Sequence, residues 1–329
     1  MRTCSSKQRS DILLRVATLF CLVVASVFGQ DSLERDLKHF HYDQHAPLDM
    51  MEGSVQDLSQ VTVHDVTYAS PRGGRVPAYL VLPKGTGKFA AILWGHWMMP
   101  GSPTANRKEF LDEAIAMAPS GVVSLLIDAP YVRSGFRLDP NPLGPQQAEV
   151  LAQQVVDLRR GVDLLLARRE VDPKRIAYVG HSFDAGTGPV LDAIDKRLAA
   201  FVFMGGPQSI RQSVLTSTAP DLVAFRKSVP LPKLRKYLDT YAWADPATYA
   251  GHLGPAAALF HYATHDDYVS IADAKYYYEM SSGRKELNFY NSSHALNSAA
   301  RHDRFDFLRE HLALSDLPAG TLEKVPPTK

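Results

Sequence analysis

Cysteine is almost absent from this chain of 329 residues, with Cys4 and Cys21 as its two examples. Both precede residue 30, so the rest of the chain carries no thiol. A thiolate nucleophile, a cysteine-ligated zinc ion, an iron–sulfur cluster and a disulfide are therefore excluded from it. Its stability has to come from a hydrophobic core, which a segment of this length can supply.

Other signatures are missing as well. The twelve histidines contain no His-Glu-x-x-His spacing, and the chain has no glycine-rich Walker loop. We therefore predict neither a metal site nor a cofactor, and we do not expect nucleotide-dependent chemistry. The 36 basic and 35 acidic residues nearly balance, which does not favour nucleic acid as a partner.

A long membrane-spanning run is also lacking at the N-terminus. The apolar segment 16–28 is short for a hydrocarbon core of about 30 Å. Arg2, Lys7 and Arg9 precede it and Gly29 follows it, which is the layout of a signal peptide. We predict that residues 1–29 are cleaved and that 30–329 form one domain, secreted or periplasmic, without stable membrane insertion. An uncleaved anchor is the alternative.

The rest of the chain has a repetitive pattern of short apolar strands and amphipathic helices, which is typical of a mostly parallel sheet covered by helices on both faces. Two runs, 61–69 and 75–82, are separated by a turn and predict an antiparallel lead-in. Apolar residues from Leu151 to Leu165 recur every three or four positions and predict a core helix. The further strands are expected at 89–94, 122–128, 176–180, 200–204, 256–262 and 286–290.

Residues 207–254 interrupt this pattern. The segment is long, proline-punctuated and rich in charged and aromatic residues. Long excursions within a compact domain are often lids or binding loops, so we expect a helical or irregular insertion over the active site.

Gly180-His181-Ser182-Phe183-Asp184 follows the strand at 176–180 and precedes a helix. This context is typical of a nucleophile elbow, a sharp turn that exposes a serine hydroxyl. The motif expects glycine two positions before and after the serine, and here Asp184 takes the second place. The alternative is an ordinary strand end at which Ser182 caps the next helix.

A serine becomes nucleophilic when a histidine removes its proton, and a carboxylate orients that histidine. Asp266 and His294 both lie just past the ends of later strands, where ligands bind in open α/β sheets. Asp267 is an alternative acid, and His261, His265 and His302 are weaker candidates for the base because packing or surface roles suffice for them.

From about residue 60 onward, the chain resembles α/β-hydrolases of the dienelactone-hydrolase or acyl-peptidase-like branch. In these proteins the acid commonly sits in a small-x-x-Asp-x-x-Val pattern, which Ala263, Asp266 and Val269 fit. The base commonly follows a strand that ends in an aromatic residue, as His294 follows Tyr290. The resemblance implies an α/β-hydrolase fold and gives Asp128 a structural role.

The negative oxygen of a tetrahedral intermediate needs backbone N–H donors. The resemblance implies one donor from Phe183 and a second from the loop after 89–94, where relatives often carry His-Gly. This chain has Trp94 in place of that histidine but keeps Gly95. We assign the second donor to His96, with Trp97 as the competitor.

These residues predict a hydrolase that cleaves small-molecule carboxylic esters through an acyl-enzyme. A peptidase of the prolyl-oligopeptidase kind is one alternative, although such enzymes usually carry a propeller before the hydrolase domain. A noncatalytic ligand-binding relative is another, supported by Asp184 and Trp94. The sequence does not predict the substrate or the oligomeric state. Trp97, Tyr131 and Trp243 are candidates for lining an apolar pocket.

Overall fold

The computed structural model describes residues 33–99, 101–207 and 209–328. The predicted signal peptide, 1–29, lies outside these residues. The contacts within the chain separate it into two compact units, with the boundary between His41 and Tyr42. In the first unit, residues 33–37 are helical and a 3-10 turn, η1, covers Lys38–Phe40. Everything below concerns the second unit, from Tyr42 onward.

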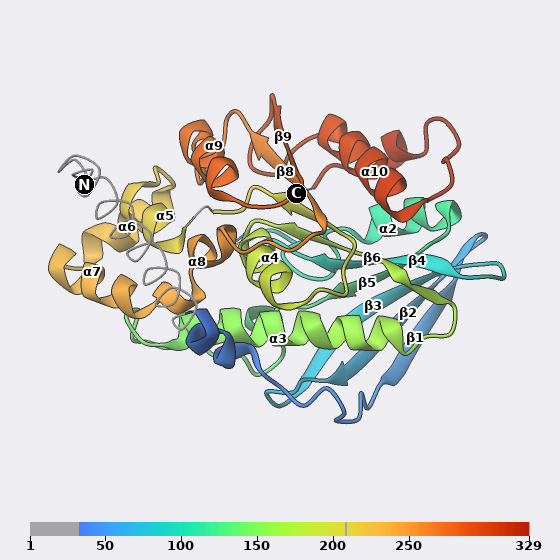
Figure 1. Ribbon diagram of the computed structural model, residues 1–329, viewed down its shortest axis with the longest axis horizontal. Helices are drawn as coiled ribbons and strands as arrows, with labels where there is room; N and C mark the ends of the chain where they lie inside the picture. The colour runs from blue at the N-terminus through green and yellow to red at the C-terminus, as the bar shows by residue number, and fades with distance from the viewer. Residues whose placement is uncertain (1–32, 100, 208, 329) are drawn as a thin grey trace, which may run out of the picture. The chain divides into compact units, whose positions relative to one another are not determined.

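The second unit is built around one β-sheet (Figure 1). Within the described residues this sheet has nine strands in the order β1-β2-β3-β5-β4-β6-β7-β8-β9. β1 to β3 pair antiparallel, β3 is antiparallel to β5, and the remaining neighbours are parallel. The antiparallel lead-in and the mostly parallel sheet were both predicted. The bounds are β1 Met51–Asp57, β2 Val61–Ala69, β3 Arg75–Pro83, β4 Phe89–Gly95, β5 Val122–Ile127, β6 Val171–His181, β7 Ala200–Met204, β8 Ala257–Ala263 and β9 Lys285–Tyr290.

Strand β1 was not predicted, whereas the other eight strands were. All seven of its residues are exposed, and it pairs with β2 at the edge of the sheet. A strand with no buried face has no alternation of apolar and polar residues, so the usual sequence signal is missing. Its place in the sheet is set by backbone pairing with β2.

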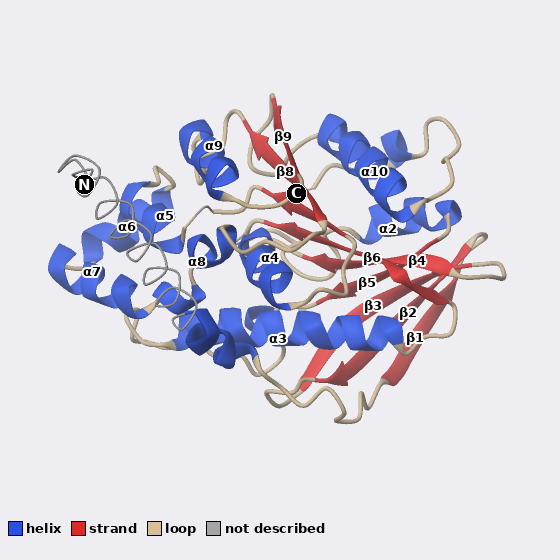
Figure 2. Cartoon of the chain, viewed as in Figure 1, coloured by secondary structure: helices blue, strands red, loops and turns tan. Residues whose placement is uncertain are grey.

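Helices cover both faces of the sheet (Figure 2). Because alternate side chains of a strand point to opposite faces of the sheet, β4 contributes to the hydrophobic core on each face. Ala91 and Leu93 pack in the cluster that contains residues of α3, α4 and α9, while Ile92 and Trp94 pack in the cluster that contains residues of α2 and α10. The bounds of these helices are α2 Leu111–Met117, α3 Gln146–Leu166, α4 Phe183–Ile194, α9 Ile271–Met280 and α10 Ser298–Leu312.

The segment 207–254 is mainly helical (Figure 1). Several of its prolines begin helices: Pro220 and Pro246 occupy first-turn positions, where the missing N–H has no intrahelical partner to lose. Val214, Leu234 and Leu238 form a small core of its own. Its helices are α5 Ile210–Thr216, α6 Pro220–Ser228, α7 Leu231–Thr240, η4 Ala242–Ala244 and α8 Pro246–Ala250. Elsewhere, short 3-10 turns are η2 Ala118–Ser120, η3 Pro130–Val132 and η5 Leu322–Lys324.

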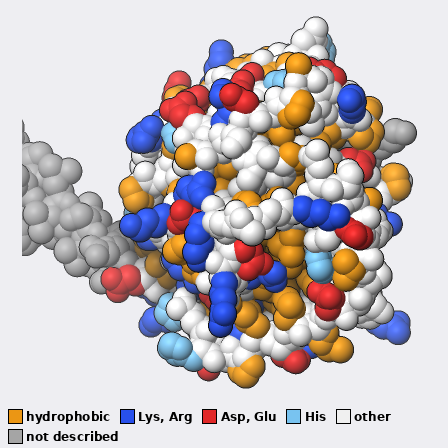
Figure 3. Space-filling model, turned by 90° about the vertical axis from the view of Figure 1, so that its right-hand side faces the viewer, with side chains coloured by type: hydrophobic (Ala, Val, Ile, Leu, Met, Phe, Trp, Pro, Cys, Tyr) orange, Lys and Arg blue, Asp and Glu red, His pale blue; other side chains and the backbone are white. Residues whose placement is uncertain are grey.

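The surface carries charges of both signs. On the face shown in Figure 3, lysine and arginine side chains lie among aspartate and glutamate side chains. Among the helices that the structure describes, none is long and apolar enough to cross a bilayer.

Candidate active site

Ser182 occupies the sharp turn between β6, which ends at His181, and α4, which begins at Phe183. Its φ of 52° and ψ of −107° place a non-glycine residue in a rarely populated region, at a cost of about 1–3 kcal/mol. Its backbone N–H donates to the carbonyl oxygen of Met204 at 2.7 Å. Its side chain makes no capping hydrogen bond to α4, so the alternative in which Ser182 is an ordinary helix cap is wrong.

The tightness of this turn explains the glycine before the serine. A Cβ atom at Gly180 would lie 2.4 Å from the carbonyl oxygen of Asp184, which no side chain tolerates. Gly180 of the motif is therefore required because two backbone segments approach closely at this turn.

Asp184, which replaces the second glycine of the motif, is fully buried. Its carboxyl group accepts hydrogen bonds of 2.9 Å from Gln154 Nε2 and from Thr187 Oγ1. Burial raises the pKa of Asp184 to about 7, although those donors and the His96 backbone N–H act in the opposite direction. A Cβ atom at Gly95 would lie 2.6 Å from Asp184, so the glycine of the β4 loop makes room for this aspartate.

Asp266 and His294 are brought together from the loops after β8 and β9. Asp266 Oδ2 lies 2.8 Å from His294 Nδ1. Asp266 Oδ1 accepts the backbone N–H groups of Tyr268 at 2.8 Å and Val269 at 3.2 Å, which fixes the carboxylate. Asp267 is exposed. The contact to the histidine therefore comes from Asp266, the residue predicted from the pattern that includes Val269.

The other ring nitrogen of His294 is free. An ionised Asp266 can only accept, so Nδ1 carries the proton and Nε2 keeps a lone pair. His294 Nε2 is buried and has no hydrogen-bond partner among the described residues. His294 and Ser182 line the same cavity. Catalytic hydrogen bonds often form fully only when a substrate is bound. The arrangement is therefore suited to a base that accepts the proton of Ser182 once a substrate is in place.

A second buried histidine holds this region together, and the sequence did not predict it. His181 Nδ1 makes a short contact with Glu109 Oε1, and His181 Nε2 lies 2.9 Å from the carbonyl oxygen of His294. Glu109 Oε2 accepts the backbone N–H of Trp97 at 2.6 Å. Both Glu109 and His181 have fully buried side chains. The pair thus links the β4 loop, the serine turn and the His294 loop.

The predicted oxyanion donors differ in their surroundings. Phe183 begins α4 and lines the cavity. The N–H of Trp97, the competitor, is taken by Glu109. His96 is buried and does not line the cavity.

The imidazole of His96 braces its loop. Its Nε2 accepts the N–H of Ala129 at 2.9 Å, and its Nδ1 lies 2.8 Å from the carbonyl oxygen of Trp97. Nδ1 therefore carries the proton. Burial lowers the pKa of His96 to about 4, which keeps the ring neutral.

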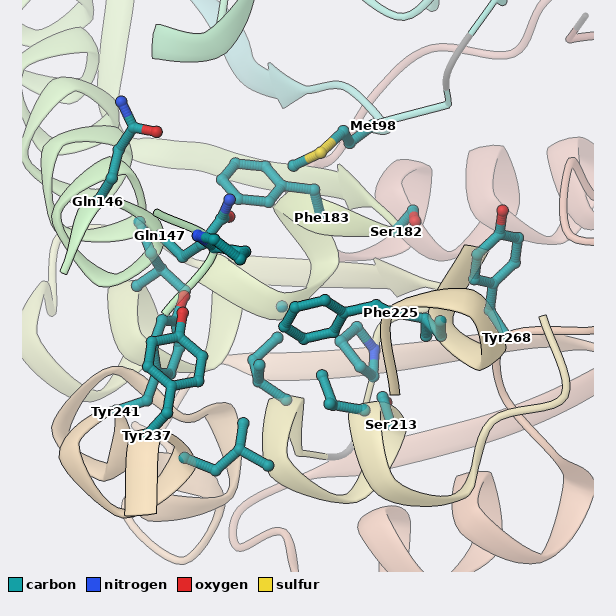
Figure 4. Close-up of a pocket in the computed structure, with 18 of the residues that line it drawn as sticks. Met98, Gln146, Gln147, Ser182, Phe183, Ser213, Phe225, Tyr237, Tyr241 and Tyr268 are labelled. Carbon is teal, nitrogen blue, oxygen red and sulfur yellow. The ribbon is translucent and has the colours of Figure 1, made fainter. Parts of the chain in front are cut away.

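The cavity beside Ser182 has a volume of about 410 Å³ and is largely apolar (Figure 4). Its lining comes from the loop 138–144, the starts of α3 and α4, the helices of the segment 207–254 and the loops after β8 and β9. Aromatic side chains contribute much of it, namely Phe183, Phe225, Tyr237, Tyr241 and Tyr268. The aromatic residues singled out from the sequence, Trp97, Tyr131 and Trp243, do not line it, because composition alone does not show which ring faces which space.

Arg133, Asp128 and the weaker histidine candidates lie outside the cavity lining. Arg133 Nη1 lies 2.7 Å from Asp157 Oδ2, so this arginine is neither solvated nor in the cavity. Asp128 accepts the N–H of Arg107 at 2.8 Å and braces the loop before α2. Buried His261 contacts Tyr290 Oη at 3.0 Å, while His265 and His302 are at the surface. In the described ranges, no three histidine or acidic side chains are placed to hold a metal ion.

No protein-family model matches the chain, and no curated protein matches it significantly. Solved structures match over most of its length. An acetyl xylan esterase from Paenibacillus sp. R4 matches with a TM-score of 0.68 and 21% identity, covering 87% of this chain and 94% of that one. Acetyl xylan esterase 1 from Thermoanaerobacterium sp. JW/SL YS485 gives 0.69 and 15%, covering 86% and 93%. The alpha/beta hydrolase GrgF from Penicillium sp. sh18 gives 0.55 and 18%, covering 76% and 98%. These similarities show a shared architecture, the α/β-hydrolase fold, which the sequence predicted.

Proposed function

We propose that this chain, which has the α/β-hydrolase fold, hydrolyses carboxylic esters with Ser182 as nucleophile, His294 as base and Asp266 as its orienting acid. One observation carries the proposal: Asp266 is paired with His294, whose Nε2 has no partner among the described residues, and His294 and Ser182 line the same cavity. A buried imidazole nitrogen without a partner is costly, and proton transfer from a serine is the role that explains it.

In the first half of the reaction, the oxygen of Ser182 forms a bond to the ester carbonyl carbon while its proton passes to His294 Nε2. The bond between that carbon and the alcohol oxygen then breaks, and the alcohol leaves with the proton from Nε2. In the second half, water gives a proton to Nε2 and adds to the acyl carbon. Release of the carboxylic acid returns the proton to Ser182.

The negative oxygen of each tetrahedral intermediate needs donors close to Ser182. Phe183 N–H follows the nucleophile directly and begins α4, whose N-terminus carries a partial positive charge. We keep His96 N–H as the second donor of the proposal, although this N–H interacts with the buried Asp184 carboxyl and has to turn from it to the oxyanion. Removing such a donor typically lowers the rate about 10² to 10³-fold.

The similar structures add support for the reaction class, since two of them are acetyl xylan esterases. The aromatic, apolar cavity of about 410 Å³ is suited to a small ester. A peptidase of the prolyl-oligopeptidase kind and a noncatalytic ligand-binding relative are the alternatives that experiment has to exclude.

Labelling with a fluorophosphonate probe tests the nucleophile. The purified protein should react, Ser182→Ala should abolish labelling, and Ser213→Ala should keep it, because Ser213 lines the same cavity without a histidine partner. Turnover of p-nitrophenyl esters should exceed that of aminoacyl p-nitroanilides. Absence of labelling would favour a noncatalytic relative, and faster anilide cleavage would favour a peptidase.

We also propose that the protein is exported after removal of residues 1–29. The basic start and the short apolar segment support this. N-terminal sequencing of the protein recovered outside the cytoplasm should begin at Gln30. Recovery of the intact N-terminus in a membrane fraction would contradict cleavage.

A further inference from the structure

Two tyrosines form the wall of the cavity that faces Ser182 from across the space. Tyr237 and Tyr241 are four residues apart, at the end of α7, and such positions share one side of a helix. Their ring centroids lie 6.2 Å apart, and both rings line the cavity. Figure 4 shows them on the opposite side of the cavity from Ser182, with Phe183 and Phe225 drawn between.

The hydroxyl groups of these tyrosines have no protein partner. Neither Oη makes a hydrogen bond within the ranges that the structure describes, although Tyr241 is only 6% exposed. Two other buried tyrosines are bonded within the protein: Tyr68 Oη donates to the carbonyl oxygen of Asp157 at 2.8 Å, and Tyr262 Oη donates to that of Gly206 at 3.0 Å. Tyr277 Oη is also unpaired, but this residue does not line the cavity. Buried tyrosine hydroxyls normally find a partner, so an occupant of the cavity is the natural one here.

The hydroxyl groups of Tyr237 and Tyr241 stay protonated over the physiological pH range, so both remain hydrogen-bond donors. Burial raises the pKa of Tyr241 and of Tyr237 above that of an ordinary phenol. A neutral tyrosine hydroxyl donates one hydrogen bond and also accepts. A hydroxyl group placed between the two can therefore accept from one tyrosine and donate to the other.

The space between Ser182 and the tyrosines favours a flat, uncharged body. Phe183 and Phe225 lie in this part of the cavity (Figure 4), and aromatic rings pack well edge to face against one another. A ring also loses less conformational freedom on binding than a flexible chain of similar size. Neither lysine nor arginine lines the cavity in the described part of the chain, and Asp139 is its one carboxylate, so an anionic group has no partner there.

We propose that the cavity takes a neutral aromatic ester whose ring carries a hydroxyl group at the end far from the ester, and that Tyr237 and Tyr241 bind this hydroxyl. The inference rests on the proposed function, because the ester has to lie at Ser182. The aromatic group can enter as the acyl part or as the alcohol part, since the chemistry of recognition is the same for both.

The test compares esters that differ only in the distal group. For the acyl arm, kcat/KM is measured with methyl 4-hydroxycinnamate and methyl cinnamate. For the alcohol arm, it is measured with 4-hydroxyphenethyl acetate and phenethyl acetate. In one arm the hydroxylated ester should be preferred about tenfold or more, because a site built to bond a hydroxyl rejects the analogue without it. Equal rates within both pairs would overturn the inference.

Tyrosine variants test whether the hydroxyl groups of Tyr237 and Tyr241 cause the preference for the hydroxylated ester. Tyr241→Phe and Tyr237→Phe should each lower the ratio of the two kcat/KM values toward one. The control Tyr276→Phe, at an exposed position of α9, should leave the ratio unchanged. A ratio that survives in the double Tyr237→Phe, Tyr241→Phe variant would overturn the role of these hydroxyls.

A binding measurement separates this inference from the proposed reaction. Ser182→Ala, which cannot acylate, is titrated calorimetrically with the methyl esters. Tighter binding of the hydroxylated ester, lost in Tyr241→Phe, supports the cavity assignment even if no ester is turned over. Turnover of p-nitrophenyl acetate without any preference, in rate or in binding, would leave the esterase proposal standing and refute this one.

Discussion

His181 Nε2 lies 2.9 Å from the carbonyl oxygen of His294, so one histidine holds the backbone of the other. A carbonyl oxygen only accepts, and Nε2 of His181 therefore carries a proton. The Nδ1 of the same ring faces Glu109 Oε1, so a single proton is shared between these two atoms. The pair has no net charge whichever atom holds the proton, which suits its complete burial.

This arrangement predicts a large difference between two substitutions of Glu109. Glu109→Gln should keep activity within about fivefold, because the introduced amide can donate to His181 Nδ1 and accept from Trp97 N–H. Glu109→Ala should leave both buried groups unpaired and lower stability by about 2–5 kcal/mol. Urea unfolding and kcat measure the two effects. Equal damage from both variants would show that the charge, not the hydrogen-bonding geometry, is essential.

Substitutions of Asp266 and of its neighbour Asp267 test which of the two carboxylates orients His294. Asp266→Asn should lower kcat by about 10⁴, because an amide N–H facing His294 Nδ1 stabilises the wrong tautomer. The Tyr268 and Val269 N–H groups that Asp266 Oδ1 accepts favour that orientation of the amide. Asp267→Asn, at the exposed neighbour, should stay within about twofold. A larger loss in Asp267→Asn would reverse the assignment.

Asp184 should make stability depend on pH. Its raised pKa means that the folded state keeps a proton which the unfolded chain releases above about pH 4. Stability attributable to Asp184 is therefore complete below about pH 4, falls as the pH rises to about 7, and is constant above. A shift of about three pKa units corresponds to a change on the order of 4 kcal/mol.

Comparison of the wild type with Asp184→Asn isolates this effect from other titrating groups. The variant should gain stability relative to the wild type as the pH rises from about 4 to about 8. Denaturant unfolding at several pH values measures the difference. A constant difference across this range would mean that Asp184 titrates normally in the folded state.

Gly205 should tolerate no side chain. Its φ is +59°, and a Cβ there would lie 3.1 Å from His294 Cε1. Gly205→Ala should therefore displace the imidazole and lower kcat by about tenfold or more, with about 1–2 kcal/mol of backbone strain. Gly251→Ala is the matched control, since nothing lies within 4 Å of a Cβ at that position. Comparable kinetics for the two variants would argue against a fixed position for His294.

Local patterns in the sequence were enough to predict much of the fold. The apolar runs gave eight strands because buried strands bear a strong signal, and the strand-to-helix context of Ser182 marked the turn. The pattern around Asp266 and the place of His294 after a strand marked the pair that the structure brings together. Each of these features depends on residues close together in the chain.

The interactions that depend on distant residues were decided by the tertiary structure alone. Glu109 and His181 are 72 positions apart, and no local pattern links them. Tyr237 and Tyr241 show an ordinary helical spacing, and only the placement of α7 reveals that their hydroxyls meet an apolar cavity instead of a protein partner. The sequence by itself determined the layers and the candidate residues, because short-range periodicity and turn chemistry are written along the chain. Folding decided which polar groups were left unpaired, because pairing depends on how segments far apart come into contact.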